Sequence, residues 1–309
     1  MQEPSQVKNL QQPPQIPRQP PLLQRLGPVP FAVVALAVVF FLYQFVAGGI
    51  TLLLFGMNVS SNEVGMFRVA TLIGQLLFIL LPTVLLVRLR GERIMEYFRI
   101  AIPEYKEIIL TFVAVFALQQ VLQGYMVMQD AIPLPAPLQH IIDKLKAAIE
   151  ETYRNLVTAH SPGEFVFVVI VIALTPAICE EMLFRGLVQR SFEKVTVGVQ
   201  GAVITGVIFA GFHLVPYSFV PLAILGVFFG FIVYRTQNIT VAVSAHFFNN
   251  FVACTAVYLE MNDDFVAIAP HRAPTSSLIF LNTVVFAVVF LLASYYFVRV
   301  TEPAEHPLE

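Results

Sequence analysis

The chain has 309 residues, of which 57% are hydrophobic and only 12% are charged, and its mean hydropathy is +0.76. These values lie far from those of soluble globular domains and indicate an integral membrane protein with several spans. The formal net charge is −2 and no dense basic segment is present, so the sequence gives no reason to expect nucleic-acid binding.

Residues 1–30 form the first segment, which holds eight prolines and several glutamines. This composition predicts a disordered tail, and the segment lacks the charged start and apolar core of a signal peptide. We therefore expect the first apolar stretch to be retained as a span. Residues 301–309 are predicted to form a second, short tail at the other end of the chain.

Between the tails, residues 31–300 consist mainly of apolar stretches that are long enough to cross a hydrocarbon core of about 30 Å. Because unpaired backbone groups are costly in lipid, such spans must be helical. The sequence therefore predicts an all-α, polytopic membrane bundle. Eight transmembrane helices are expected, at residues 31–55, 66–88, 108–128, 164–190, 197–214, 218–235, 238–259 and 277–299.

Lysine and arginine are distributed unevenly over the loops between these spans. Twelve fall on the side of the two tails and five on the other side. Because cytoplasmic loops are enriched in these residues, we expect both termini to be cytoplasmic. An even number of spans also places both termini on one side of the membrane. The expected location is a bacterial inner membrane.

One segment outside the spans, residues 137–158, also has a helical pattern. Its apolar residues recur at helical spacing, at Leu138, Ile141, Ile142, Leu145, Ile149, Tyr153 and Leu156. This pattern predicts an amphipathic helix on the outer membrane surface. Packing against the bundle is one interpretation, and a lid over a cavity is the other.

The polar residues within the spans are few. The two cysteines, Cys179 and Cys254, are interpreted as small core residues rather than as a disulfide pair. Several amide side chains are expected to bond neighbouring helices, although one of them could line a substrate cavity: Gln75, Gln119, Gln120, Gln123, Asn249 and Asn282.

The sequence ICEEMLFRG places two carboxylates and a guanidinium inside the fourth span. Ionisable residues within a membrane are costly and therefore indicate a functional site. Glu181 and Arg185 are four residues apart, which favours an ion pair on one helix face. Glu180 points about 100° away from that face and has no charged partner on its own helix.

A proline lies one turn before these carboxylates. Pro176 removes a backbone donor and frees the carbonyl of Ile172. We therefore expect the helix to be distorted just before Glu180.

Two histidines lie within spans: His213 in VIFAGFHL and His246 in VSAHFFNN, where Asn250 follows one turn later. At 1.5 Å per residue from the expected span ends, these groups and Glu180 lie at depths of roughly 12–22 Å. All are near the middle of the bilayer. Four polar groups from three helices are thus expected to converge on one buried site.

Three motifs occur in a fixed order along the chain: EExxxR from Glu180 to Arg185, FxxxH from Phe209 to His213, and HxxxN from His246 to Asn250. In this order they resemble the motifs of the CAAX protease and bacteriocin-processing family of intramembrane proteases. The resemblance covers about residues 164–255, and the first three spans are similar to the family only in hydropathy.

The resemblance implies peptide hydrolysis inside the membrane, with Glu180 and His213 activating water. It also implies that His246 and Asn250 bind the oxyanion. The residue types agree with this chemistry, since a carboxylate and an imidazole can share the proton of water and two donors one turn apart can reach one oxyanion. A membrane-embedded or lipid-modified, CAAX-like peptide is the implied substrate, and the lipid bilayer is the other partner.

Three further residues are expected around this site. Glu181 and Arg185 would hold the distorted turn as an ion pair, and Phe209 would form part of the pocket wall. No cofactor is required by this interpretation.

Two alternatives remain. In the first, Glu180, His213 and His246 are ligands of a zinc ion in an intramembrane metalloprotease. In the second, the protein is no enzyme, and the same groups form a proton relay of a proton-coupled transporter or a degenerate site in a membrane scaffold. The sequence lacks paired broken helices in corresponding halves, which counts against a transporter.

Overall fold

The computed structural model describes residues 22–56, 59–60, 62–261 and 276–301. Every regular element within these ranges is a helix, as the sequence predicts. The predicted all-α membrane bundle is thereby confirmed, and the protein is an integral, multi-pass membrane protein.

The N-terminal half contains three long helical segments and one helix that lies across the bundle. Two of the long segments are interrupted by π-helical turns, labelled η. The elements are α1 (Leu22–Arg25), α2 (Pro28–Phe40), η1 (Phe41–Ala47), α3 (Gly48–Phe55), α4 (Val64–Gln75), η2 (Leu76–Leu80), α5 (Leu81–Leu89), α6 (Ile94–Tyr97), α7 (Tyr105–Asp130) and α8 (Ala136–Val157).

The C-terminal half begins with the long helical segment that carries the paired glutamates. Its elements are α9 (Pro162–Val168), η3 (Val169–Leu174), α10 (Thr175–Glu181), η4 (Met182–Gln189), α11 (Arg190–Glu193), α12 (Gln200–Phe212), the 3₁₀-helix η5 (Pro216–Ser218), α13 (Phe219–Thr236), α14 (Ile239–Met261) and α15 (Ser276–Val300).

Seven helical segments in the described ranges are long and apolar enough to cross a membrane, one fewer than expected. The exception is the span predicted at 197–214. It forms only the 13-residue helix α12, which is about 20 Å long and ends at Phe212. Both ends of α12 lie within three residues of the predicted bounds, so the helix was placed correctly but is too short to count as a full span.

The predicted N-terminal tail also needs a correction. Residues 22–30 were expected to belong to it, but they form α1 and the first residues of α2. Pro28 is the first residue of α2. An N–H group at this position has no acceptor within the helix, so its absence in proline costs no hydrogen bond. The rest of the expected tail, residues 1–21, lies outside the described residues, as do residues 302–309 of the C-terminal tail.

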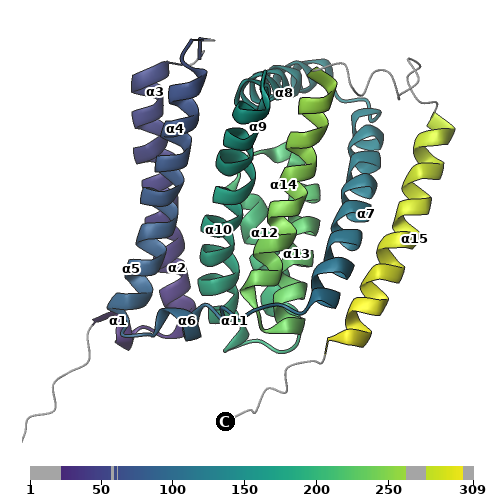
Figure 1. Ribbon diagram of the computed structural model, residues 1–309. Coiled ribbons are helices and arrows are strands. Elements are labelled where there is room, and N and C mark those ends of the chain that lie inside the picture. Colours follow the sequence, from purple (N-terminus) through teal and green to yellow (C-terminus); the bar gives the residue numbers. More distant parts are fainter. Residues whose placement is uncertain (1–21, 57–58, 61, 262–275, 302–309) are drawn as a thin grey trace, which may run out of the picture.

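The helices form a flat row of antiparallel segments (Figure 1). The purple and blue helices α2 to α5 form one end of the row, and α7 and α15 form the other end. The helices that carry the three motifs, α10, α12 and α14, lie between them. The site motifs are therefore surrounded by other helices.

Helix α8 lies across one end of the bundle, roughly perpendicular to the others (Figure 1). Its bounds agree closely with the amphipathic helix predicted at 137–158. Leu138 and Ile141 are exposed, whereas Val157 at its end is fully buried. The helix thus contacts the bundle and also presents an apolar face to its surroundings.

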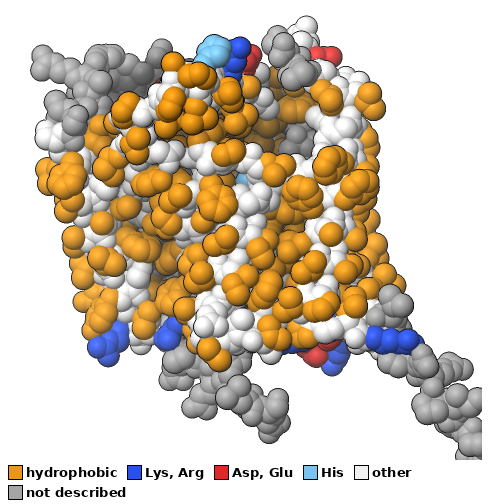
Figure 2. Space-filling model, turned by 180° about the vertical axis from the view of Figure 1, so that it is seen from behind, with side chains coloured by type: hydrophobic (Ala, Val, Ile, Leu, Met, Phe, Trp, Pro, Cys, Tyr) orange, Lys and Arg blue, Asp and Glu red, His pale blue; other side chains and the backbone are white. Residues whose placement is uncertain are grey.

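The surface matches a protein that lies in a bilayer. Figure 2 shows hydrophobic side chains over the sides of the bundle, with lysine and arginine mainly at its lower end. That end holds α1, α6, α11 and the last turn of α15 (Figure 1). The first described helix and the end of the last one therefore lie on the same side of the bundle (Figure 1).

The two larger hydrophobic clusters of the described residues lie within the bundle. The first joins the segments α2, α5 and η4, with Phe31, Val87 and Leu187 among its fully buried members. The second joins α7, α13, α14 and α15 and contains Phe229 and Phe297. Each fully buried aliphatic or aromatic side chain contributes about 1.5–3 kcal/mol in an aqueous reference, but in lipid, close packing contributes most of the stability.

The charge distribution predicts that the end with α6 is cytoplasmic and that α8 is outside. This is tested with Met95→Cys and His140→Cys, because both residues are exposed and lie at opposite ends. The native Cys179 and Cys254 are fully buried, so they should give little background labelling. In intact cells an impermeant maleimide should label His140→Cys, and it should label Met95→Cys only after permeabilisation. The opposite pattern would reverse the orientation.

Candidate active site

A fully buried ion pair lies at the centre of the bundle. The Arg185 Nη1 group donates to Glu181 Oε1 at 2.8 Å, and both side chains are 0% exposed. Arg185 also donates through Nη2 to the carbonyl of Gly226 on α13, at 2.9 Å. The ion pair predicted from the four-residue spacing is present, and it also fixes the motif helix to α13.

The same carboxylate also binds a histidine from another helix. His246 on α14 lies with its Nδ1 atom 2.8 Å from Glu181 Oε1. Because a carboxylate oxygen accepts, Nδ1 of His246 carries the hydrogen. From the sequence, His246 was expected at the oxyanion, or at zinc in the alternative, and Glu181 was expected to pair with Arg185. The structure instead makes Glu181 the common partner of Arg185 and His246.

Glu180, the adjacent carboxylate, is in a different environment. Its Oε2 atom is 3.9 Å from Nε2 of His213, which is longer than a hydrogen bond. Among the described residues, Glu180 Oε2 has no hydrogen-bond partner. The side chains of Glu180 and His213 are 16% and 29% exposed, whereas the Oε2 atom of Glu180 is itself buried. The structure therefore brings these two residues together, as predicted, without a direct bond.

His213 directly follows the last residue of α12. Its Nδ1 atom is 2.7 Å from the carbonyl oxygen of Phe209, one turn earlier. A carbonyl can only accept, so Nδ1 donates and the Nε2 atom of the neutral ring is an acceptor. This bond directs the Nε2 lone pair of His213 toward Glu180.

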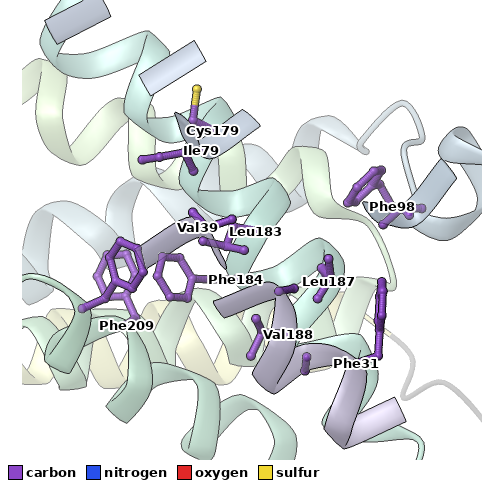
Figure 3. Close-up of a cluster of buried hydrophobic side chains, with 14 of the residues drawn as sticks. Phe31, Val39, Ile79, Phe98, Cys179, Leu183, Phe184, Leu187, Val188 and Phe209 are labelled. Atoms are coloured by element: carbon purple, nitrogen blue, oxygen red, sulfur yellow. The ribbon is translucent and has the colours of Figure 1, made fainter. Parts of the chain in front are cut away.

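Phe209 links the two parts of the site. Its ring centroid is 4.6 Å from that of His213 and 6.1 Å from that of His246. The Cζ atom of Arg185 lies 4.7 Å from the same centroid, within the range of a cation–π contact. Phe209 is only 2% exposed and packs edge-on against Phe184, its neighbour in Figure 3. It is therefore a buried spacer between the two imidazoles rather than an exposed wall.

The carbonyl that Pro176 leaves without a donor finds a partner on α14. Asn250 donates through Nδ2 to the carbonyl of Ile172 at 3.2 Å, and its Oδ1 accepts from Asn249 at 3.1 Å. The expected helix distortion takes the form of the π-helix η3, which ends just before Thr175. The Nδ2 group carries two hydrogens, so one remains for another acceptor.

The other polar residues of the spans have mixed positions. Gln119 donates to the carbonyl of Asn249 at 3.3 Å, so its predicted role as a helix contact is confirmed. Gln120, Gln123 and Asn282 instead line a cavity of about 590 Å³ between α7 and α15. Cys179 and Cys254 are fully buried free cysteines, as expected for core residues.

Among known protein families, residues 162–252 match the family model described as type II CAAX prenyl endopeptidase Rce1-like. This match confirms the resemblance to CAAX proteases that the three motifs indicate. Searches of curated proteins and of solved structures found no match.

Two residues near His213 were not predicted from the sequence. Gln44 on η1 donates to the carbonyl of Phe212, directly before His213, and Gln129 on α7 donates to the carbonyl of Tyr217, in the loop after it. Each is a single amide in an apolar or terminal helix segment, and neither belongs to a motif. Only the early end of α12, which creates unpaired carbonyls, could have indicated that such donors are required.

The two adjacent glutamates should differ in their effect on stability. Glu181→Gln leaves Arg185 buried without a counter-charge and should lower the free energy of unfolding by about 3–5 kcal/mol. Unfolding is measured by titration with a denaturing detergent in mixed micelles. Glu180→Gln is the matched control, because it changes the neighbouring carboxylate and removes no ion pair with Arg185. Equal losses of stability in the two variants would contradict the assignment.

Proposed function

We propose that this protein is an intramembrane endopeptidase that hydrolyses a peptide bond of a membrane-embedded or lipid-modified substrate. The observation that carries the proposal is the gap of 3.9 Å between Glu180 Oε2 and His213 Nε2. Both atoms are acceptors when His213 is neutral, and neither can satisfy the other. A water molecule supplies two hydrogens and can donate one to each.

In the proposed reaction, this water attacks the carbonyl carbon of the scissile bond. Glu180 and His213 together take up the proton that the water loses, so the new C–O bond forms without releasing free hydroxide. The proton is then passed to the leaving nitrogen as the C–N bond breaks. The products are a carboxylate and an amine, and the two residues return to their initial state.

His246 and Asn250 are proposed to bind the oxyanion of the tetrahedral intermediate. With its Nδ1 hydrogen directed at Glu181, His246 can donate from Nε2 only as the imidazolium. Glu181 stabilises this cation, and a positive donor suits a developing negative charge. Asn250 supplies the second Nδ2 hydrogen, which its bond to Ile172 leaves available.

The surroundings support a substrate that comes from the membrane. The site lies between helices whose outer surfaces are apolar, so a soluble peptide would have to cross a hydrophobic layer to reach it (Figure 2). The family description names CAAX prenyl endopeptidases, whose substrates carry a lipid on a C-terminal peptide. A lipid-modified, CAAX-like peptide is therefore one proposed substrate class.

The zinc alternative is less well supported by the positions of the side chains. A zinc site requires its ligand atoms within about 2.0–2.2 Å of one point. In the described part of the chain, no three His, Cys, Asp or Glu side chains are grouped in a way that could hold a metal ion. This supports the carboxylate mechanism, which we propose in place of a zinc site formed by Glu180, His213 and His246.

A chelation experiment separates the two mechanisms. Purified protein, treated exhaustively with a chelator and shown to contain well under one equivalent of zinc, should still cleave a lipid-modified or transmembrane peptide. Cleavage is followed by mass spectrometry of the products. Glu180→Gln should abolish turnover under the same conditions, because it cannot accept a proton from water.

The outcome that supports the alternative is equally specific. Loss of cleavage on chelation, restored by one equivalent of zinc, would identify a metalloprotease. In that case His213→Ala and His246→Ala should also lose bound metal. No cleavage by either the loaded or the metal-free protein, with any membrane peptide, would instead favour a non-enzymatic scaffold or transporter.

A further inference from the structure

Helix α12 ends inside the bundle, and His213 is the first residue after it. The last carbonyls of any helix have no partner within the helix. At a surface, water would bond them, but the interior of a bilayer contains almost none. The end of α12 therefore requires donors from other parts of the protein.

Each of the last four carbonyls of α12 has a donor. Three bonds are local: Phe209 O with His213 Nδ1, Ala210 O with His213 N at 3.3 Å, and Gly211 O with Leu214 N at 3.2 Å. The fourth donor comes from the first long helical segment, where Gln44 Nε2 bonds Phe212 O at 2.9 Å. Gln44 thus fixes the residue directly before His213.

Gln44 lies in the π-helix η1, between α2 and α3. Such turns are rare, cost stability and occur frequently at functional sites. The extra residue of a π-turn rotates the side chains that follow relative to the rest of the helix. The presence of η1 at this position is consistent with a requirement to place one polar side chain against α12.

A second glutamine holds the other end of the same loop. Gln129 Nε2, near the end of α7, donates to the carbonyl of Tyr217 at 2.9 Å. Lys146 of α8 lies over the Tyr217 ring, with Nζ 5.4 Å from the ring centroid, and forms an ion pair with Asp130. The loop of residues 213–218 is therefore bonded at both ends by glutamine amides.

Between these two bonds the backbone is strained. Leu214 has a φ of 56°, which is uncommon for a residue other than glycine. Its side chain is 59% exposed, so burial of the side chain does not offset the strain. A strained conformation persists only where its surroundings impose it, and such residues are concentrated at functional sites. The bonds at the two ends of the loop provide that constraint.

We infer that Gln44 and Gln129 are positioning residues for His213, which hold the two ends of its loop so that Nε2 faces Glu180. Both lie outside the segment 162–252 that matches the family model. The helices beyond the motif-bearing core would then have a direct role in the geometry of the site. The expected change in the rate of peptide cleavage rests on the proposed function, whereas the expected change in the NMR signal of the His213 ring does not.

The test compares Gln44→Met and Gln129→Met, which keep the length of the side chain and remove the donor. Gln75→Met is the matched control: Gln75 is a buried amide of the next span, and its side-chain oxygen has no hydrogen-bond partner among the described residues. The first readout is the ¹H–¹³C spectrum of the histidine rings, in which the His213 signal is assigned by its loss in His213→Ala. The second is the kinetics of peptide cleavage.

We expect the His213 ring signal to shift in both glutamine variants and to remain in place in Gln75→Met. Each glutamine variant should lower kcat about tenfold, the effect of one lost hydrogen bond, with KM changed by less than about twofold. If a methionine variant does not fold, Gln44→Asn and Gln129→Asn replace it. These keep the amide, but the chain is one methylene too short to reach the carbonyl.

Unchanged ring signals in Gln44→Met and Gln129→Met would overturn the inference, whatever happens to the rate. An equal shift in Gln75→Met would also overturn it, since the effect would then be general. If the wild-type protein cleaves no peptide, the proposed function fails, and the ring signals still decide whether the glutamines position His213.

Discussion

A charge inside a bilayer needs a partner within the protein, and the pair formed by Glu181 and Arg185 meets this requirement at the centre of the bundle. Nη2 of Arg185 donates to the Gly226 carbonyl, and the same glutamate binds His246. The continuous segment formed by α10 and η4 is thereby bonded to both α13 and α14. Within a bilayer, water is not available to replace these hydrogen bonds if they break. Removal of either charge would leave the other buried and unpaired. This constraint explains why the segment can hold two carboxylates and a guanidinium in an apolar sequence.

The pairing of Glu181 also determines the state of Glu180. Adjacent residues on a helix point in different directions, so the partner that occupies one carboxylate cannot reach the other. Oε2 of Glu180 has no hydrogen-bond partner among the described residues and lies 3.9 Å from Nε2 of His213. We propose that Glu181 holds the structure and that Glu180 acts in the reaction. The two imidazoles follow the same division, because His246 is bonded to Glu181 and His213 faces Glu180.

Much of this arrangement could be predicted from the sequence because it depends on local spacing. The apolar stretches predicted the helices, and the four-residue spacing predicted the ion pair. Pro176 indicated that a carbonyl one turn earlier lacks its usual donor, and Asn250 bonds this carbonyl. The contact of His246 with Glu181 could not be predicted, because it depends on the rotation of α14 relative to α10. The donor that bonds the end of α12 could not be predicted either, because Gln44 lies far away in the sequence. Residues 22–30 were expected to belong to the tail because they share its proline-rich and glutamine-rich composition, although the first turn of a helix tolerates proline.

The central claim is that the protein hydrolyses peptide bonds of membrane-embedded substrates and that Glu180 activates the attacking water. The most direct measurement compares protein N-termini in membranes from cells that express the wild-type chain or Glu180→Gln at equal levels, with labelled termini identified by mass spectrometry. The account predicts a set of new N-termini, located within or next to apolar or lipid-modified segments, that is present with the wild-type chain and absent with Glu180→Gln. Identical sets of N-termini in the two membranes would contradict it.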